Sequence, residues 1–186
     1  MQSLANFLPT LWIPSFAMAI GLPKFAGPLG LALANLGTCF GCLLMGVLVD
    51  RFHISVAIAV ATLGQMIAIF VFWGLTSSQV MLYVFALTFG MFGGGYSSSW
   101  SGYAGAIKPR GYNGHINTGL VVSLMAAGRG IGAVISGPLS ESLLQTGWKP
   151  DADFAYGTGY GLIIIFSGIT ATFGGAACIG RVLKVM

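Results

Sequence analysis

The sequence predicts an all-α protein of one domain, residues 1–186, built as a polytopic membrane bundle of six transmembrane helices. Two observations predict this. Hydrophobic residues make up 56% of the chain and charged residues only 6%, whereas soluble domains average about 25% charged residues. The run from Ile54 to Ile107 contains no Asp, Glu, Lys or Arg, and one membrane-spanning helix needs about 20 mostly apolar residues. That run is long enough for two spans, and so few charges cannot make a water-facing surface.

Charge-free segments place the six spans in order. The first segment follows Met1 directly and lacks the basic region and small-residue cleavage site of a signal peptide, so we expect it to be retained. The long charge-free run breaks at residues 74–79, and the fifth segment is interrupted only by Arg129. The expected spans are about 3–22, 27–49, 55–74, 80–104, 117–143 and 157–180.

An even number of spans puts both termini on one side, and the loop charges indicate which side. Short loops rich in Lys and Arg stay in the cytoplasm. Five basic residues fall after the second span, after the fourth span or in the C-terminal tail, and only two fall in the other loops; the groups are Arg51, Lys108, Arg110, Arg181 and Lys184, against Lys24 and Lys149. Both termini are therefore expected to be cytoplasmic. Because these residues are scattered singly, no nucleic acid partner is expected.

Glycines recur at four-residue intervals inside the spans. Small residues at that spacing lie on one helix face and let helix backbones approach closely, so tight helix packing is the favoured interpretation. The pairs are Gly37 with Gly41, Gly90 with Gly94, Gly128 with Gly132, and Gly157 with Gly161. Prolines within or near span ends permit bending, because proline removes a backbone hydrogen bond; they are Pro9, Pro14, Pro28 and Pro138.

Arg129 is the most informative single residue, because it falls near the middle of the fifth span. A cation at bilayer depth costs at least about 2.5–3.5 kcal/mol on insertion scales. No acidic residue lies in the middle of a span, since Asp50 and Glu141 are at span ends, so an internal ion pair at that depth is not expected. Two interpretations remain: backbone carbonyls of a broken helix satisfy Arg129, or Arg129 binds an anion such as a carboxylate.

The loop after the second span contains Gly46, Leu48, Asp50 and Arg51 at close spacing. Gly46 is expected to let a neighbouring helix come close, and Asp50 to pair with Arg51 or with a helix N-terminus. This stretch resembles the front half of the loop signature of the major facilitator superfamily, Gly-x-Leu-x-Asp-Arg. The back half of that signature, a Gly and two basic residues, is absent, because the chain has His53, Ile54 and Ser55 there.

Two further stretches, 93–102 and 128–141, resemble spans of the fungal monocarboxylate-transporter-like branch of that superfamily. The second signature copy in the superfamily is commonly degenerate, so the resemblance implies the C-terminal six-helix half. It further implies a substrate held near the midplane and alternating access, with spans 1, 2, 4 and 5 lining the path and spans 3 and 6 supporting them. Arg129 would hold the negative charge of the substrate, Gly46, Asp50 and Arg51 would form a cytoplasmic gate, and the plasma membrane would be the location.

Further candidate substrate contacts are Tyr96, Trp100 and Asn117. Tyr96, Trp100 and Tyr103 recur at helical spacing, which suits either a substrate path or an aromatic belt at the membrane surface. Hydrogen bonds between helices explain the polar residues in or near spans as well as substrate contact does; these residues are Asn35, Gln65, Asn117 and Ser123.

The sequence predicts neither an enzyme nor a cofactor or metal site. Cys39 and Cys42 have the spacing of a redox pair, but their place inside a lipid span favours small-residue packing. His53 and His115 form no visible ligand pair. The expected partners are the lipid bilayer, a small anionic substrate, and an N-terminal six-helix half or a second copy. The alternatives are a non-transporting regulatory or assembly subunit, a truncated inactive fragment, and a membrane enzyme that uses the cysteines or histidines. If transport is proton-coupled, the titrating carboxylate is expected to lie outside this chain.

Overall fold

The computed structural model describes residues 2–52, 54–96, 118–146 and 154–175, and these residues form helices joined by short connections. The predicted all-α class is confirmed. Two of the α-helices continue into a π-helical segment of five or six residues. The elements are α1 (Gln2–Ala19), α2 (Ala26–Arg51), α3 (Ile54–Ile67) with η1 (Ala68–Trp73), α4 (Gln79–Phe89) with η2 (Gly90–Gly94), α6 (Thr118–Gln145), the 3-10 helix η4 (Phe154–Gly157) and α7 (Gly161–Gly174).

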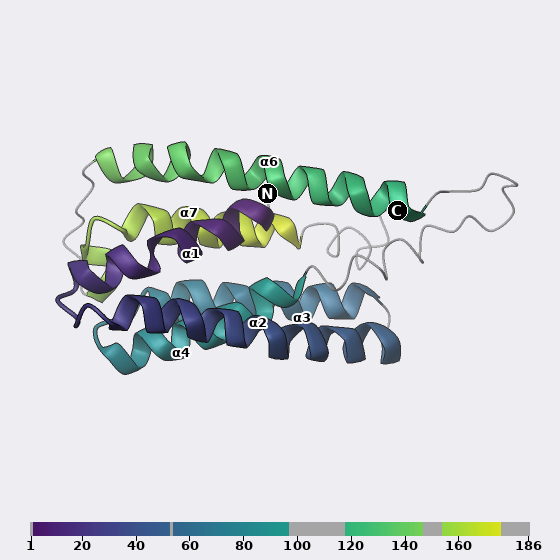
Figure 1. Ribbon diagram of the computed structural model, residues 1–186, viewed down its shortest axis with the longest axis horizontal. Coiled ribbons are helices and arrows are strands. Elements are labelled where there is room, and N and C mark those ends of the chain that lie inside the picture. The colour runs from purple at the N-terminus through teal and green to yellow at the C-terminus, as the bar shows by residue number, and fades with distance from the viewer. Residues whose placement is uncertain (1, 53, 97–117, 147–153, 176–186) are drawn as a thin grey trace, which may run out of the picture.

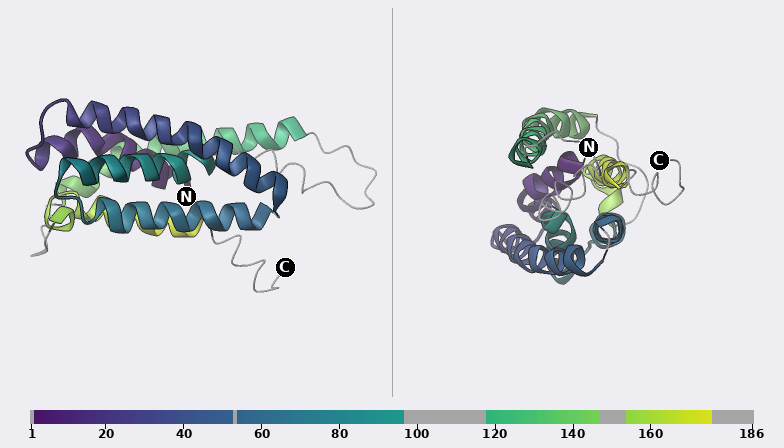
Figure 2. Two further views of the ribbon diagram at one scale, coloured as in Figure 1. Left: turned by 90° about the horizontal axis from the view of Figure 1, so that it is seen from below. Right: turned by 90° about the vertical axis from the view of Figure 1, so that its right-hand side faces the viewer.

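The helices run along the long axis of the bundle (Figure 1). α6 lies at one edge, α1 and α7 lie next to it, and α2, α3 and α4 lie toward the other edge. The end view in Figure 2 places α6 and α2 on either side of α1 on one face, with α3 and α7 on the opposite face. Successive helices alternate in direction, so the end of α2 and the start of α6 lie at the same end of the bundle (Figure 1).

Three helices of the described chain are long and apolar enough to cross a membrane: Ala26–Arg51, Ile54–Trp73 and Gly119–Gln145. They coincide with the predicted spans 27–49, 55–74 and 117–143. The stretches Gln79–Gly94 and Gly161–Gly174 are shorter apolar helices, and the predicted spans 80–104 and 157–180 extend beyond the described residues. α1, of 18 residues, corresponds to predicted span 3–22. Multi-pass membrane insertion is thus supported, and a total of six spans stays a prediction.

Local signals explain where α1 ends and where α4 begins. Gly21 adopts a positive φ of 77°, and its N–H donates to the Met18 carbonyl at 3.0 Å while that of Leu22 donates to Ala17 at 3.0 Å. This pair of bonds is the Schellman motif, which ends helices at a glycine. α4 begins after Ser78, whose hydroxyl accepts a hydrogen bond from the Met81 N–H at 3.4 Å, as expected of a helix N-cap.

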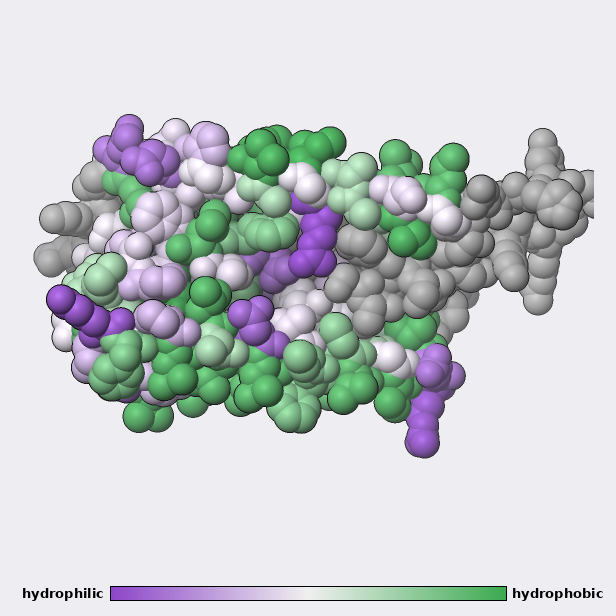
Figure 3. All heavy atoms as spheres, in the orientation of Figure 1, coloured by the Kyte–Doolittle hydropathy of each residue, from purple (hydrophilic) through white to green (hydrophobic). Residues whose placement is uncertain are grey.

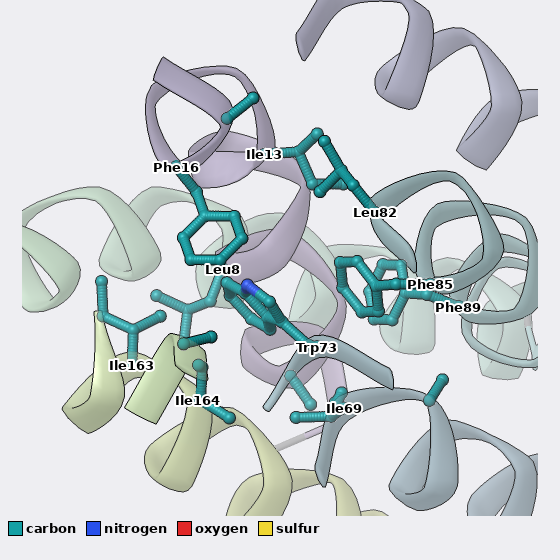
Figure 4. Close-up of a cluster of buried hydrophobic side chains, with 14 of the residues drawn as sticks. Leu8, Ile13, Phe16, Ile69, Trp73, Leu82, Phe85, Phe89, Ile163 and Ile164 are labelled. Atoms are coloured by element: carbon teal, nitrogen blue, oxygen red, sulfur yellow. The ribbon is translucent and has the colours of Figure 1, made fainter. Parts of the chain in front are cut away.

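A cluster of buried apolar side chains joins the helices near the end of the bundle where α1 finishes and α4 and α7 begin (Figure 4). The Trp73 ring stacks on Phe85, with centroids 5.1 Å apart, and Phe16 meets Trp73 edge-on at 6.0 Å. Lipid tails are as apolar as these side chains, so the cluster stabilises the bundle through close van der Waals packing rather than through removal of apolar surface from water.

Glycine allows the backbones of α2 and the α4–η2 helix to touch. A methyl group at Gly37 would overlap the Leu87 carbonyl oxygen, and one at Gly41 would overlap that of Met91. On the other side, a methyl group at Gly90 would overlap the Ala34 carbonyl oxygen. The predicted packing role of these glycines is confirmed, and the structure adds that the two glycine pairs pack against each other's helix.

Gly90→Ala is expected to destabilise the bundle by about 1–3 kcal/mol, because the added methyl group must push two backbones apart. The matched control is Gly130→Ala on α6, where a methyl group would meet no atom within 4 Å among the described residues and where Ala favours the helix by about 1 kcal/mol. Thermal unfolding of the purified chain in detergent should show a lower midpoint for Gly90→Ala alone. Equal midpoints for the two variants would contradict this account of the packing.

Candidate functional site

Arg129 lies eleven residues after Thr118, the first residue of α6, and this helix runs without a break to Gln145. The helix break that one interpretation of Arg129 required is therefore not present in α6. The side chain is half-buried, and its guanidinium carbon lies 5.5 Å from the centre of the Phe7 ring on α1. A guanidinium at that distance from an aromatic face is attracted by the ring quadrupole, by about 0.5–1 kcal/mol at exposed sites.

The guanidinium borders a cavity of about 200 Å³, here called the Arg129 cavity. Four parts of the bundle line it: α1, α2, α4 with η2, and α6. These helices correspond to predicted spans 1, 2, 4 and 5; a substrate path along them stays a prediction. Its lining residues are Asn6, Phe7, Thr10, Ala34, Asn35, Thr38, Phe89, Gly90, Gly94 and Arg129.

The polar side chains of the Arg129 cavity hold their hydrogen bonds mainly within their own helices. Thr10 Oγ1 donates to the Asn6 carbonyl at 2.9 Å, and Asn35 Nδ2 donates to Leu31 at 3.0 Å. Thr38 Oγ1 lies 3.0 Å from the Ala34 carbonyl and 3.4 Å from that of Gly90. These hydroxyls and amides keep acceptor lone pairs, while the positive charge comes from Arg129.

The charge balance of the Arg129 cavity decides what it can bind. Its described lining contains one guanidinium and no carboxylate. A guanidinium presents five N–H donors in a planar fork that matches carboxylate geometry. In the space-filling view, which shows the same face as Figure 1, hydrophilic side chains lie in the middle, between apolar side chains along α6 and α2 (Figure 3). The cavity is thus suited chemically to a small anion.

Among the other predicted substrate contacts, Tyr96 lies within the described residues, and it is not at Arg129. Tyr96 packs against Ile54 and Ile58 at the start of α3 and does not line the Arg129 cavity. Trp100 and Asn117 lie outside the described residues, as does Tyr103. Their role in substrate contact stays a prediction.

The predicted gate residues lie at the end of α2. Asp50 and Arg51 are exposed there, and Arg51 occupies the last turn, where a cation complements the helix dipole. Gly46 does not bring a helix of the described chain close, because a methyl group at this position would meet no atom of those residues within 4 Å. That expectation is corrected for this chain, and a gating role stays a prediction.

Cys39 and Cys42 are free, with Cys39 exposed and Cys42 half-buried. Cys39 therefore does not serve the tight packing expected of it within the described chain. His53 and His115 lie outside the described residues. Among the residues that the structure describes, no group of His, Cys, Asp or Glu has an arrangement that could hold a metal ion.

Several residues of the Arg129 cavity were not identified from the sequence, namely Asn6, Phe7, Thr10 and Thr38. A signal for them existed. Asn6 and Thr10 are four residues apart, and Asn35 and Thr38 three apart, so each pair lies on one helix face. Polar pairs at that spacing inside apolar helices mark a polar helix face.

Comparison with known proteins gives one distant relationship. No protein-family model and no solved structure matches the chain. The chain is 28% identical over 139 residues to the MFS-type transporter pynF of Aspergillus niger, an alignment that covers 75% of this chain and 31% of that transporter. The chain therefore spans about a third of the length of its curated relative. This distant similarity supports the resemblance to the major facilitator superfamily, a class of transporters rather than enzymes.

The contact between Arg129 and Phe7 predicts a spectroscopic signature. Protons above an aromatic face are shifted upfield, so the guanidinium protons of Arg129 should resonate upfield of those of Arg51, and Phe7→Leu should abolish the difference. Phe52→Leu, at an exposed position after α2, is the control and should leave Arg129 unchanged. NMR of the chain in lipid nanodiscs measures both, and an Arg129 spectrum insensitive to Phe7→Leu would contradict the contact.

Proposed function

We propose that the chain is part of a membrane transporter that binds a small organic anion, such as a monocarboxylate, at Arg129 and moves it by alternating access. The observation that carries this proposal is the guanidinium of Arg129, which borders a cavity about halfway along α6. Burying a cation at that depth costs free energy, and an anionic ligand offsets this cost through charge-assisted hydrogen bonds.

The dimensions of the Arg129 cavity favour a substrate of a few carbon atoms. Its volume of about 200 Å³ is below the roughly 300–1,000 Å³ of sites for drug-sized ligands. The carboxylate would lie against Arg129, with the amides of Asn6 and Asn35 beside it. Phe7 and Phe89 supply apolar contact for the rest of the molecule.

This proposal requires a second wall for the path. α6 is exposed along most of its length, and its only buried described side chains are Ser136 and Ser140. In the whole transporter we expect an N-terminal six-helix half or a second copy of the chain to cover this face. The proposal also includes six spans with both termini in the cytoplasm. It places a gate at Gly46, Asp50 and Arg51, and it places the protein in the plasma membrane.

Two other functions predict different behaviour. A non-transporting regulatory or assembly subunit would bind a transporter, and the flux of that transporter would be insensitive to Arg129. A membrane enzyme that used Cys39 and Cys42 would lose activity when both are replaced by serine and keep it when Arg129 is changed. If Arg129 binds the transported anion, uptake should fall when Arg129 is changed and should be unaffected when both cysteines are replaced. These substitutions therefore separate the three functions.

Replacing Arg129 by Gln should lower saturable uptake of radiolabelled pyruvate about 10- to 100-fold at low substrate concentration. A hydrogen bond to a charged group contributes about 1.5–3 kcal/mol, and each 1.4 kcal/mol is tenfold in affinity. Arg129→Lys should retain part of the uptake, since it keeps the charge but not the planar fork. Proteoliposomes containing the whole native protein provide the measurement.

The control for this uptake experiment is Thr88→Ala on α4, because among the described residues the Thr88 hydroxyl bonds to carbonyls of its own helix alone. Its uptake should match that of the unmodified protein. Undiminished pyruvate uptake by Arg129→Gln would refute the assignment of Arg129 as the anion-binding residue.

The need for a second wall predicts the size of the protein in its own membranes. An antibody to residues 180–186 should detect a band well above the 19.3 kDa of the chain, or a band at that mass that chemical crosslinking converts to a dimer. The first result corresponds to a longer transporter and the second to a pair of copies. A band at 19.3 kDa that no crosslinker shifts would contradict the proposed assembly.

A further inference from the structure

A second cavity, here called the Glu141 cavity, lies between α1 and α6 toward the end of the bundle opposite Arg51. Its volume is about 530 Å³, within the range of small-molecule sites. In Figure 3, hydrophilic side chains gather over that end of α6. Its lining residues are Leu11, Trp12, Ser15, Gly137, Pro138, Ser140 and Glu141.

The Glu141 cavity is distinct from the Arg129 cavity. The two share no lining residue, and Glu141 follows Arg129 by twelve positions on the same helix. At a rise of 1.5 Å per residue, this separation is about 18 Å along α6. A ligand of a few carbon atoms bound at Arg129 therefore cannot reach Glu141.

The Glu141 cavity has the opposite charge. Among the described residues, its lining contains one carboxylate and no Lys, Arg or His. Glu141 Oε1 accepts a hydrogen bond from Gln145 Nε2 at 3.2 Å, and within the part of the chain that the structure describes Oε2 accepts none. The carboxylate is exposed, so a ligand can reach it from the cavity.

Ser15 and Trp12 add two further features on α1. The Ser15 hydroxyl has no hydrogen bond to any described residue, whereas Thr10 Oγ1 on the same helix donates to the carbonyl four residues earlier. The Trp12 ring is half-buried and held edge-on to Tyr160, with centroids 5.9 Å apart. The cavity thus presents a carboxylate, an available hydroxyl and a fixed indole ring.

We propose that the Glu141 cavity binds the ammonium group of a small organic amine. An ammonium has three N–H donors and no acceptor, which matches the carboxylate of Glu141 and the lone pairs of the Ser15 hydroxyl. Trp is the aromatic side chain that attracts cations most strongly, and Leu11 and Pro138 provide apolar contact for the carbon skeleton. Anions are disfavoured by the Glu141 charge, and neutral alcohols gain hydrogen bonds without the charge.

Binding to the whole chain in nanodiscs of zwitterionic lipid tests this inference, with empty nanodiscs subtracted. Three probes share a phenyl ring and differ in charge: 2-phenylethylamine, 2-phenylethanol and 3-phenylpropionate. By isothermal titration at pH 7, the amine should bind at least about tenfold more tightly than the alcohol, because hydrogen bonds to charged groups are the stronger ones. Equal affinities, or no binding of the amine, would overturn the proposal.

Substitutions test whether the amine binds in the Glu141 cavity. Glu141→Gln keeps the side-chain shape and should weaken amine binding at least about tenfold, while Ser15→Ala should weaken it less. Ser142→Ala, next to Glu141 but outside the cavity lining, is the control and should bind like the unmodified chain. Amine affinity unaffected by both Glu141→Gln and Ser15→Ala would refute the site.

The Arg129 site serves as an independent reference. Binding of pyruvate should be unchanged by Glu141→Gln and weakened by Arg129→Gln, and retained binding in the Glu141 variant also shows that the variant is folded. If the chain binds the amine at Glu141 and no anion at Arg129, the amine site stands and the proposed transport function fails. The reverse result refutes the amine site alone.

Discussion

The direct contact between the backbones of α2 and the α4–η2 helix determines much of the rest of the structure. In a bilayer the hydrophobic effect does not drive one apolar helix toward another, so close packing and interhelical polar contacts must hold the bundle together. Gly41 and Gly90 permit that packing because a side chain at either position would overlap the opposite backbone. The same contact puts Thr38 beside Gly90 and so forms one wall of the Arg129 cavity.

α6 completes that cavity and is held to the bundle by far fewer buried residues. A methyl group at Gly128 would meet no described atom within 4 Å, whereas one at Gly132 would lie 2.7 Å from Ser3 Cβ on α1. Thus the third glycine pair does not repeat the packing of the first two: one member faces α1 and the other faces open space. Under the proposed function, a helix that carries the anion-binding cation and packs little against the other described helices is suited to move against a partner, as alternating access requires.

The sequence predicted the helices better than the site, for physical reasons. Helix bounds follow from local apolar runs, so α2 (Ala26–Arg51) matches the expected span 27–49 closely. Arg129 was evident because a mid-span cation is costly, but its neighbour Phe7 depends on how α1 and α6 cross. Tyr96 was a candidate because Tyr96, Trp100 and Tyr103 recur at helical spacing, but the segment that precedes Tyr96, Gly90–Gly94, is a π-helix. Its wider turns change the direction of the residues that follow, and Tyr96 packs against α3.

Arg129 and Glu141 have opposite charges on one helix. The free-energy cost of each charge depends on its depth in the bilayer, and the two depths differ. The cost of a charge is greatest at the centre of the bilayer, so a charge near the middle of a span, such as Arg129, needs contacts that offset this cost. Glu141 lies near the end of α6, where a carboxylate is inexpensive, and its presence alone would indicate nothing. What distinguishes it is the cavity it shares with Trp12 and Ser15 on α1. Because α1 and α6 also meet at Phe7 and Arg129, any movement of α6 relative to α1 must reshape both cavities at once.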